Sequence, residues 1–173
     1  MCVNNSVLDQ LVQYFRKSGF VKVVLVALGL SHLFNVFFGL MGYYLDHLNI
    51  HFSSSPELSG EPIGSLVISN VIIVPVLETF IFQLCIYKLL RRFRLFKSHI
   101  RYIILVSAFL FGVAHYYHIF YMIRAFFVGI ILMVVYVSKL DTEKLAFWLV
   151  ALIHALDNLI TISLFCVLET FAQ

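Results

Sequence analysis

The chain of 173 residues is 62% hydrophobic and only 12% charged, with a formal net charge of +3 and a mean hydropathy of +0.98. A soluble domain carries about 25% charged and roughly 45–50% apolar residues, so this apolar surplus has no soluble core large enough to hold it. The composition therefore predicts an all-α, multi-pass protein of the cell membrane, folded as one membrane domain over residues 1–173. No nucleotide, haem or phosphate-loop motif is present, and no basic, aromatic-rich patch indicates nucleic acid.

Five apolar runs are long enough to predict transmembrane helices. They cover residues 21–45, 63–87, 102–121, 123–139 and 145–169. Because the third and fourth runs almost touch, we expect a tight turn or a partly buried loop between them. Residues 1–20 carry a weakly amphipathic pattern and are expected at the inner face, either on the membrane surface or as a frayed end.

The basic residues predict the orientation of these spans. Eleven of the 12 Lys and Arg residues flank the spans on one side, and Arg124 is the exception. The connection over residues 46–62 contains no Lys or Arg. By the positive-inside rule, the N-terminus is expected inside and the C-terminus outside, with the basic side facing anionic lipid.

Three ionisable residues inside the spans need an explanation, because such a group costs about 2.5–3.5 kcal/mol at the bilayer centre. Glu78, His115 and His154 each lie ten to fourteen residues from the basic residue that ends their span. At about 1.5 Å per residue, three different helices place them at similar heights, roughly 15–21 Å from the basic side. We expect them to face one another.

Helical spacing adds further side chains to this set. The pairs that lie four residues apart, and therefore share a helix face, are His154 and Asn158, Phe111 and His115, and Thr79 and Gln83. Asp157 and His118 are expected to support the site rather than to act in it. His32 and Asn35 in the first span are expected only to hold helices together.

The chemistry of these residue types favours a water-activating site. A buried carboxylate such as Glu78 and a neighbouring imidazole, His115, can take a proton from water. Donors from His154 and Asn158 can meet charge that develops on a carbonyl oxygen. Two alternatives stay open: Glu78, His115 and His154 are also a ligand set for a divalent metal such as zinc, and Glu and His carry protons in small transporters or proton-relay subunits.

Three stretches resemble the CPBP or Abi family of intramembrane proteases, which includes type II CAAX prenyl endopeptidases and bacteriocin-immunity proteins. They read PVLETFIFQ (75–83), FGVAH (111–115) and HALDN (154–158). The family has E-E-x-x-x-R on one span, F-x-x-x-H on a later span and H-x-x-x-N or H-x-x-x-D on a last one. The resemblance covers about residues 63–165, which would be the protease-like core.

The resemblance implies an endopeptidase that hydrolyses a membrane-anchored or hydrophobic peptide. Glu78 and His115 match the residues that activate water, and His154 and Asn158 match the pair that stabilises the oxyanion. Thr79 and Gln83 stand where the family has its second glutamate and its arginine. This loss of a charged pair leaves open a catalytically inactive relative that serves as a membrane binding or bacteriocin-immunity protein.

Overall fold

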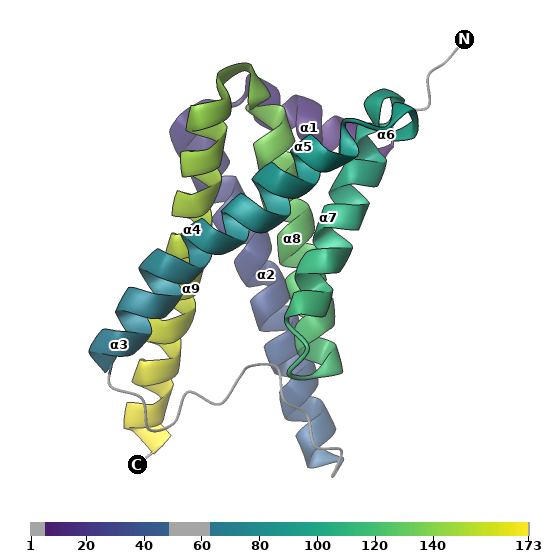
Figure 1. Cartoon of the computed structure of the whole chain (residues 1–173). Coiled ribbons are helices and arrows are strands. Elements are labelled where there is room, and N and C mark those ends of the chain that lie inside the picture. The colour runs from purple at the N-terminus through teal and green to yellow at the C-terminus, as the bar shows by residue number, and fades with distance from the viewer. Residues whose placement is uncertain (1–5, 49–62, 173) are drawn as a thin grey trace.

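The computed structural model describes residues 6–48 and 63–172, and these residues form a helical bundle with no strand among them (Figure 1). The predicted all-α class is confirmed. Residues 49–62 of the connection expected on the outer side lie outside the described residues, as do residues 1–5 of the N-terminal segment.

The N-terminal segment forms α1 (Val7–Lys17), a short helix that begins with a capping box. The Ser6 side chain accepts a hydrogen bond from the Asp9 backbone, and the Asp9 carboxylate accepts one from the Ser6 backbone N–H. Phe15 is completely buried, and α1 packs against α8 (Ile119–Ser138). Residues 7–17 are therefore a packed element of the bundle rather than a frayed end.

After α2 (Phe20–His47), the chain forms a second long rod from alternating α-helical and π-helical segments (Figure 1). These segments are α3 (Ile63–Val67), η1 (Ile68–Ile73), α4 (Val74–Glu78), η2 (Thr79–Cys85) and α5 (Ile86–Leu90). Pro75 is buried near the start of α4, where its missing N–H interrupts the regular helical hydrogen bonds. The two π-helical segments flank α4, at whose end Glu78 lies, and such segments are frequent at functional sites.

The rest of the chain forms α6 (Arg94–Ser98), α7 (Ile100–Ala114), α8, the short η3 (Leu140–Thr142) and α9 (Glu143–Ala172). The predicted boundary between the third and fourth spans was wrong, because α7 ends at Ala114 and α8 begins at Ile119. The turn starts where the His115 N–H bonds to the Gly112 carbonyl, and it ends where the His118 ring accepts from the Phe120 N–H. These local hydrogen bonds mark the end of α7 and the start of α8. The apolar content of the sequence gave no sign of them.

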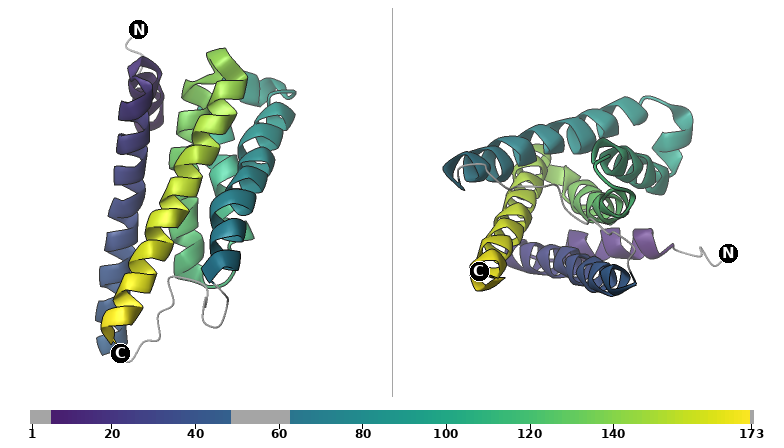
Figure 2. Two further views of the ribbon diagram at one scale, coloured as in Figure 1. Left: turned by 90° about the vertical axis from the view of Figure 1, so that its left-hand side faces the viewer. Right: turned by 90° about the horizontal axis from the view of Figure 1, so that it is seen from below.

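α7 and α8 approach closely because two glycines lie between them. A Cβ on Gly112 would lie 2.9 Å from the Met122 carbonyl oxygen, and one on Gly129 would lie 3.1 Å from the Ala108 Cα. α8 is the central helix, and it contacts α1, α2, α7 and α9. Every residue of 131–138 is buried. The view along the bundle places α8 among the other helices (Figure 2).

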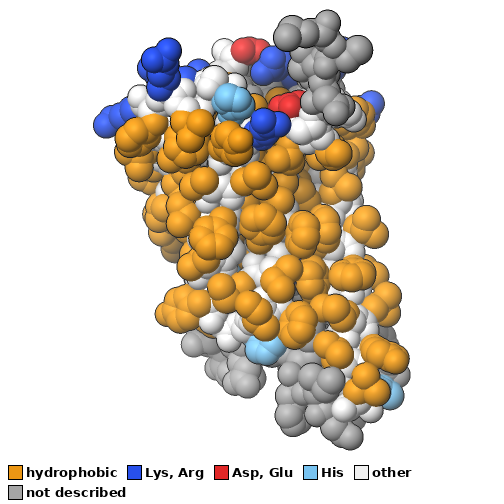
Figure 3. Space-filling model, turned by 90° about the vertical axis from the view of Figure 1, so that its right-hand side faces the viewer, with side chains coloured by type: hydrophobic (Ala, Val, Ile, Leu, Met, Phe, Trp, Pro, Cys, Tyr) orange, Lys and Arg blue, Asp and Glu red, His pale blue; other side chains and the backbone are white. Residues whose placement is uncertain are grey.

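The outer surface of the bundle is apolar, as contact with lipid requires. Large exposed side chains include Phe37, Ile72, Phe109 and Trp148. Hydrophobic side chains form a continuous band on the face shown in Figure 3. In the described part of the chain, four helices are long and apolar enough to cross a membrane. The chain is therefore a multi-pass membrane protein.

The predicted count of five spans is not confirmed, because α7 has only 15 residues. At about 1.5 Å per residue it is roughly 22 Å long, which is short for a hydrocarbon core of about 30 Å. Lys and Arg side chains gather at one end of the band, as the predicted orientation requires (Figure 3). Which end faces inward stays a prediction.

Candidate active site

Glu78 lies between two histidines that come from different helices. Its Oε1 is 3.6 Å from His115 Nε2, and its Oε2 is 3.4 Å from His154 Nε2. The structure thus brings together the three ionisable residues that the sequence placed at similar heights. The Glu78 side chain is 20% exposed and that of His154 only 4%, so the carboxylate is still reachable while the imidazole is enclosed.

His115 has its proton position fixed by the end of α7. Its Nδ1 lies 2.7 Å from the Phe111 carbonyl oxygen, and because a carbonyl only accepts, Nδ1 must carry a proton. A neutral His115 therefore presents a bare Nε2 to Glu78. An ionised carboxylate also only accepts, so an attractive contact between these two groups requires one proton on the pair or a water molecule between them.

His154 presents the opposite arrangement. Its Nδ1 is buried and has no hydrogen-bond partner among the described residues. With its proton on Nε2, a neutral His154 can donate toward Glu78 Oε2, which is buried and likewise lacks a hydrogen-bond partner at this separation. One imidazole can therefore accept from the centre of the site while the other donates to it.

Phe111 fixes both rings. It is almost fully buried, with its ring centroid 4.5 Å from that of His115 and 5.7 Å from that of His154. Phe82 on η2 packs edge-on against it at 5.3 Å. This apolar wall holds the two imidazoles and limits water around them; a supporting role for Phe111 stays a prediction.

Asn158, Asp157 and His118 each contact a different part of the bundle. Asn158, one turn along α9 from His154, donates through Nδ2 to the Asn70 carbonyl oxygen at 2.7 Å. It thereby ties α9 to the π-helical segment η1. Asp157 turns toward α2, and His118 caps α8.

Thr79 and Gln83 are completely buried, and their polar side-chain atoms have no hydrogen-bond partner in the described part of the chain. The sequence did not predict contacts for Asn70 or Arg124. The Asn70 carbonyl accepts a hydrogen bond from Asn158, and Arg124 donates one to Asn35. The available signal for Arg124 was its place as the one basic residue away from the basic end.

The arrangement does not fit the metal site that the sequence left open. Within the described residues, no three His, Cys, Asp or Glu side chains are placed to hold a metal ion. The reason is visible at Glu78, where each histidine approaches a different carboxylate oxygen. Each histidine therefore pairs with its own carboxylate oxygen.

The fold and the site together define a polytopic membrane protein with a half-buried carboxylate between two histidines, one of which lies one helical turn from an asparagine. The family model described as type II CAAX prenyl endopeptidase Rce1-like matches residues 61–160, more than half of the chain. The chain belongs to this family, which confirms the resemblance and supports protease activity. No curated protein and no solved structure matches the chain.

Proposed function

We propose that the protein is an intramembrane endopeptidase that hydrolyses a membrane-anchored or hydrophobic peptide. The observation that carries this proposal is the position of Glu78, whose two oxygens lie within 3.6 Å of two histidines from separate helices. Family membership supports the reaction class. The family description names prenyl endopeptidases, so a lipid-anchored peptide is the substrate class to test first.

The proposed reaction begins with a water molecule between Glu78 and His115. The bare Nε2 of His115 and the carboxylate oxygen both accept hydrogen bonds, so together they can hold this water and remove one proton from it. The resulting hydroxide forms a bond to the carbonyl carbon of the substrate. When the C–N bond breaks, the proton held by the pair passes to the leaving amine.

His154 is proposed to stabilise the tetrahedral intermediate. The carbonyl oxygen becomes negatively charged, and a proton on His154 Nε2 can donate to it because this nitrogen already faces the centre of the site. Asn158 has a second amide hydrogen besides the one bonded to Asn70. We propose that this hydrogen is the other oxyanion donor.

Substitution of the site residues in reconstituted liposomes tests the proposal. Glu78→Gln keeps the side-chain size but removes the base, and His115→Ala removes its partner, so we expect each to lower the cleavage rate by about 10²–10⁴-fold. His154→Ala removes one oxyanion donor, and we expect a loss of about 10²–10³-fold. The readout is cleavage of a fluorogenic prenylated peptide.

Asp141→Asn is the matched control, since Asp141 is exposed in η3, outside the site, and it should retain the wild-type rate. Circular dichroism checks that every variant remains folded and inserted. Wild-type cleavage in both Glu78→Gln and His115→Ala would contradict these roles. Proteoliposome flux without any peptidase activity would point instead to transport.

A further inference from the structure

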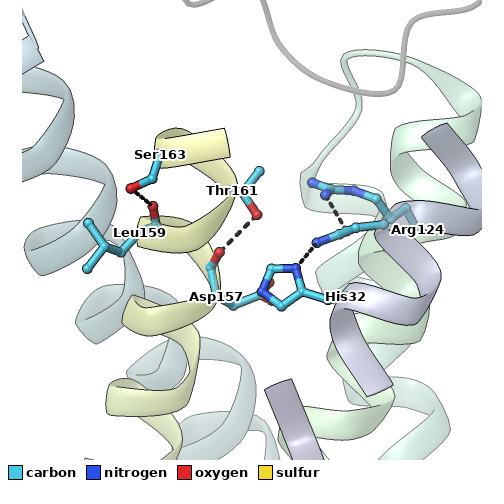
Figure 4. Close-up of polar contacts among 7 residues, drawn as sticks. His32, Arg124, Asp157, Leu159, Thr161 and Ser163 are labelled. Carbon is cyan, nitrogen blue, oxygen red and sulfur yellow. Dashed lines mark hydrogen bonds and ion pairs between the residues drawn. The ribbon is translucent and has the colours of Figure 1, made fainter. Parts of the chain in front are cut away.

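A chain of polar side chains joins α8, α2 and α9 inside the bundle (Figure 4). Arg124 Nη1 donates to Asn35 Oδ1 at 2.6 Å, and Asn35 Nδ2 lies 3.2 Å from His32 Nδ1. His32 Nε2 in turn lies 3.4 Å from Asp157 Oδ1. The chain therefore runs from a cation on α8 to a carboxylate on α9 through two neutral groups on α2.

The direction of this chain follows from hydrogen-bond chemistry. A guanidinium only donates, so Asn35 must present its oxygen to Arg124 and its amide hydrogens to His32. His32 Nδ1 then accepts, and a neutral imidazole carries its proton on Nε2, which faces Asp157. At the first two links a donor meets an acceptor, whereas His32 Nε2 and Asp157 Oδ1 face each other at 3.4 Å without forming a hydrogen bond. The charges of Arg124 and Asp157 balance across three helices.

Both ends of the chain adjoin the candidate active site. On α9, Asp157 immediately precedes Asn158 and lies three residues after His154. On α8, the Arg124 guanidinium lies 4.7 Å from the centroid of the Tyr121 ring, and the Tyr121 ring lies 5.4 Å from that of His115. A change in this chain of polar side chains would therefore alter the positions of both histidines that face Glu78.

We propose that His32, Asn35, Arg124 and Asp157 are positioning residues that fix how α8 and α9 are rotated about their own axes relative to α2. An uncompensated charge is expensive inside a bilayer, and one residue of helix corresponds to about 100° of rotation. Turning α9 away would separate Asp157 from His32 and remove His154 from Glu78 at the same time. This inference rests on the proposed peptidase function, whose site it orients.

Two substitutions of His32 test whether these polar side chains position the candidate active site. His32→Leu removes both polar atoms, whereas His32→Gln keeps one donor and one acceptor to bridge Asn35 and Asp157. We expect His32→Leu to lower kcat by about 10–100-fold with little change in KM, because it displaces catalytic groups without removing substrate contacts. His32→Gln should restore most of kcat.

A spectroscopic readout separates this inference from the proposed function. In protein labelled with ¹⁵N-histidine, the imidazole resonances of His115 and His154 should shift in His32→Leu and stay near wild type in His32→Gln. His99→Leu, at the basic end beyond the site, is the control that should leave both resonances unchanged. If wild type cleaves no peptide but this pattern appears, the peptidase proposal fails and the positioning role stands.

Unchanged resonances and unchanged kcat in His32→Leu would overturn the proposal, and so would a His32→Gln variant as impaired as His32→Leu. Charge balance gives a second test, which is useful if His32→Leu does not fold. Arg124→Gln and Asp157→Asn should each lower the Tm, and the double variant should lower it by less than the sum. Additive losses would show that the two ends are not coupled.

Discussion

Thr79 and Gln83 are the residues at which the sequence predicts a departure from the family pattern, and both are buried without hydrogen-bond partners among the described residues. A buried polar group without a partner costs about 1–3 kcal/mol. Because neither polar group makes a hydrogen bond to Glu78, the pair has no evident part in holding the carboxylate. The site is instead built by His115, His154 and Phe111.

Apolar replacement of this pair should therefore be tolerated. We expect Thr79→Val and Gln83→Met to leave cleavage close to wild type and to raise the free energy of unfolding by about 1–3 kcal/mol each, because they remove an unsatisfied buried group of similar size. Thermal unfolding in detergent and the peptide assay measure the two effects. A large loss of cleavage would show that Thr79 or Gln83 takes part in the reaction.

The contact of each histidine with its own oxygen of Glu78 also predicts the response to chelators. Since the described residues offer no three-ligand metal site, we expect cleavage to persist after dialysis against 1,10-phenanthroline. Metal analysis of the purified protein before and after dialysis supplies the control. Loss of activity that returns on adding zinc would contradict this prediction and require ligands beyond those considered.

Among the elements, α7 and α8 position His115 through close backbone contact. An added Cβ would meet a neighbour at a shorter distance on Gly112 than on Gly129, and the Gly112 carbonyl also accepts the N–H of His115. The neighbouring atom at this point is a backbone oxygen, which cannot move aside as a flexible side chain can. The hairpin geometry and the placement of His115 therefore depend on the same glycine.

Gly112→Ala should lower the free energy of unfolding by about 1–3 kcal/mol, because the added Cβ meets the Met122 carbonyl oxygen at 2.9 Å. Cleavage should fall as well, since His115 moves with the end of α7. The matched control is Gly29→Ala on α2, where a Cβ meets nothing within 4 Å and the substitution should stabilise the helix by about 0.5–1 kcal/mol. Equal effects in the two variants would refute the role of close packing.

At the scale of the whole molecule, charge and apolar surface divide the bundle along its length. Basic side chains gather at one end of the hydrophobic band (Figure 3). The turn between α7 and α8 lies toward the other end, as does the C-terminal end of α9 (Figures 1 and 2). The positive-inside rule assigns the basic end to the inner face.

Cysteine labelling tests this orientation in a background where Cys2, Cys85 and Cys166 are replaced by Ser. Tyr116, in the turn after α7, is 79% exposed. A cysteine at this position, Tyr116→Cys, should react with a membrane-impermeant maleimide in intact cells. Ser98→Cys, exposed in α6 at the basic end, should react only after permeabilisation. The reverse pattern would invert the topology.

The sequence by itself determined the membrane class, the all-helical fold and the family. Hydropathy and charge are sums over neighbouring residues, so predictions from them do not depend on the exact helix ends. The motifs around Glu78, His115 and His154 are each short enough to be recognised within one predicted span. Hydropathy misplaced the turn after α7, because a hydrogen bond of His115 ends α7 there and one of His118 begins α8.

Only the tertiary structure decided which polar groups meet. Asp157 and Asn158 are adjacent in sequence, yet successive helix residues point about 100° apart. Asn158 therefore bonds to Asn70 in η1, while Asp157 faces His32 on α2. Asn35 and Arg124 are 89 residues apart in the chain and still form a 2.6 Å hydrogen bond. The rotation of each helix about its axis depends on contacts with its neighbours, and hydropathy along one helix does not contain them.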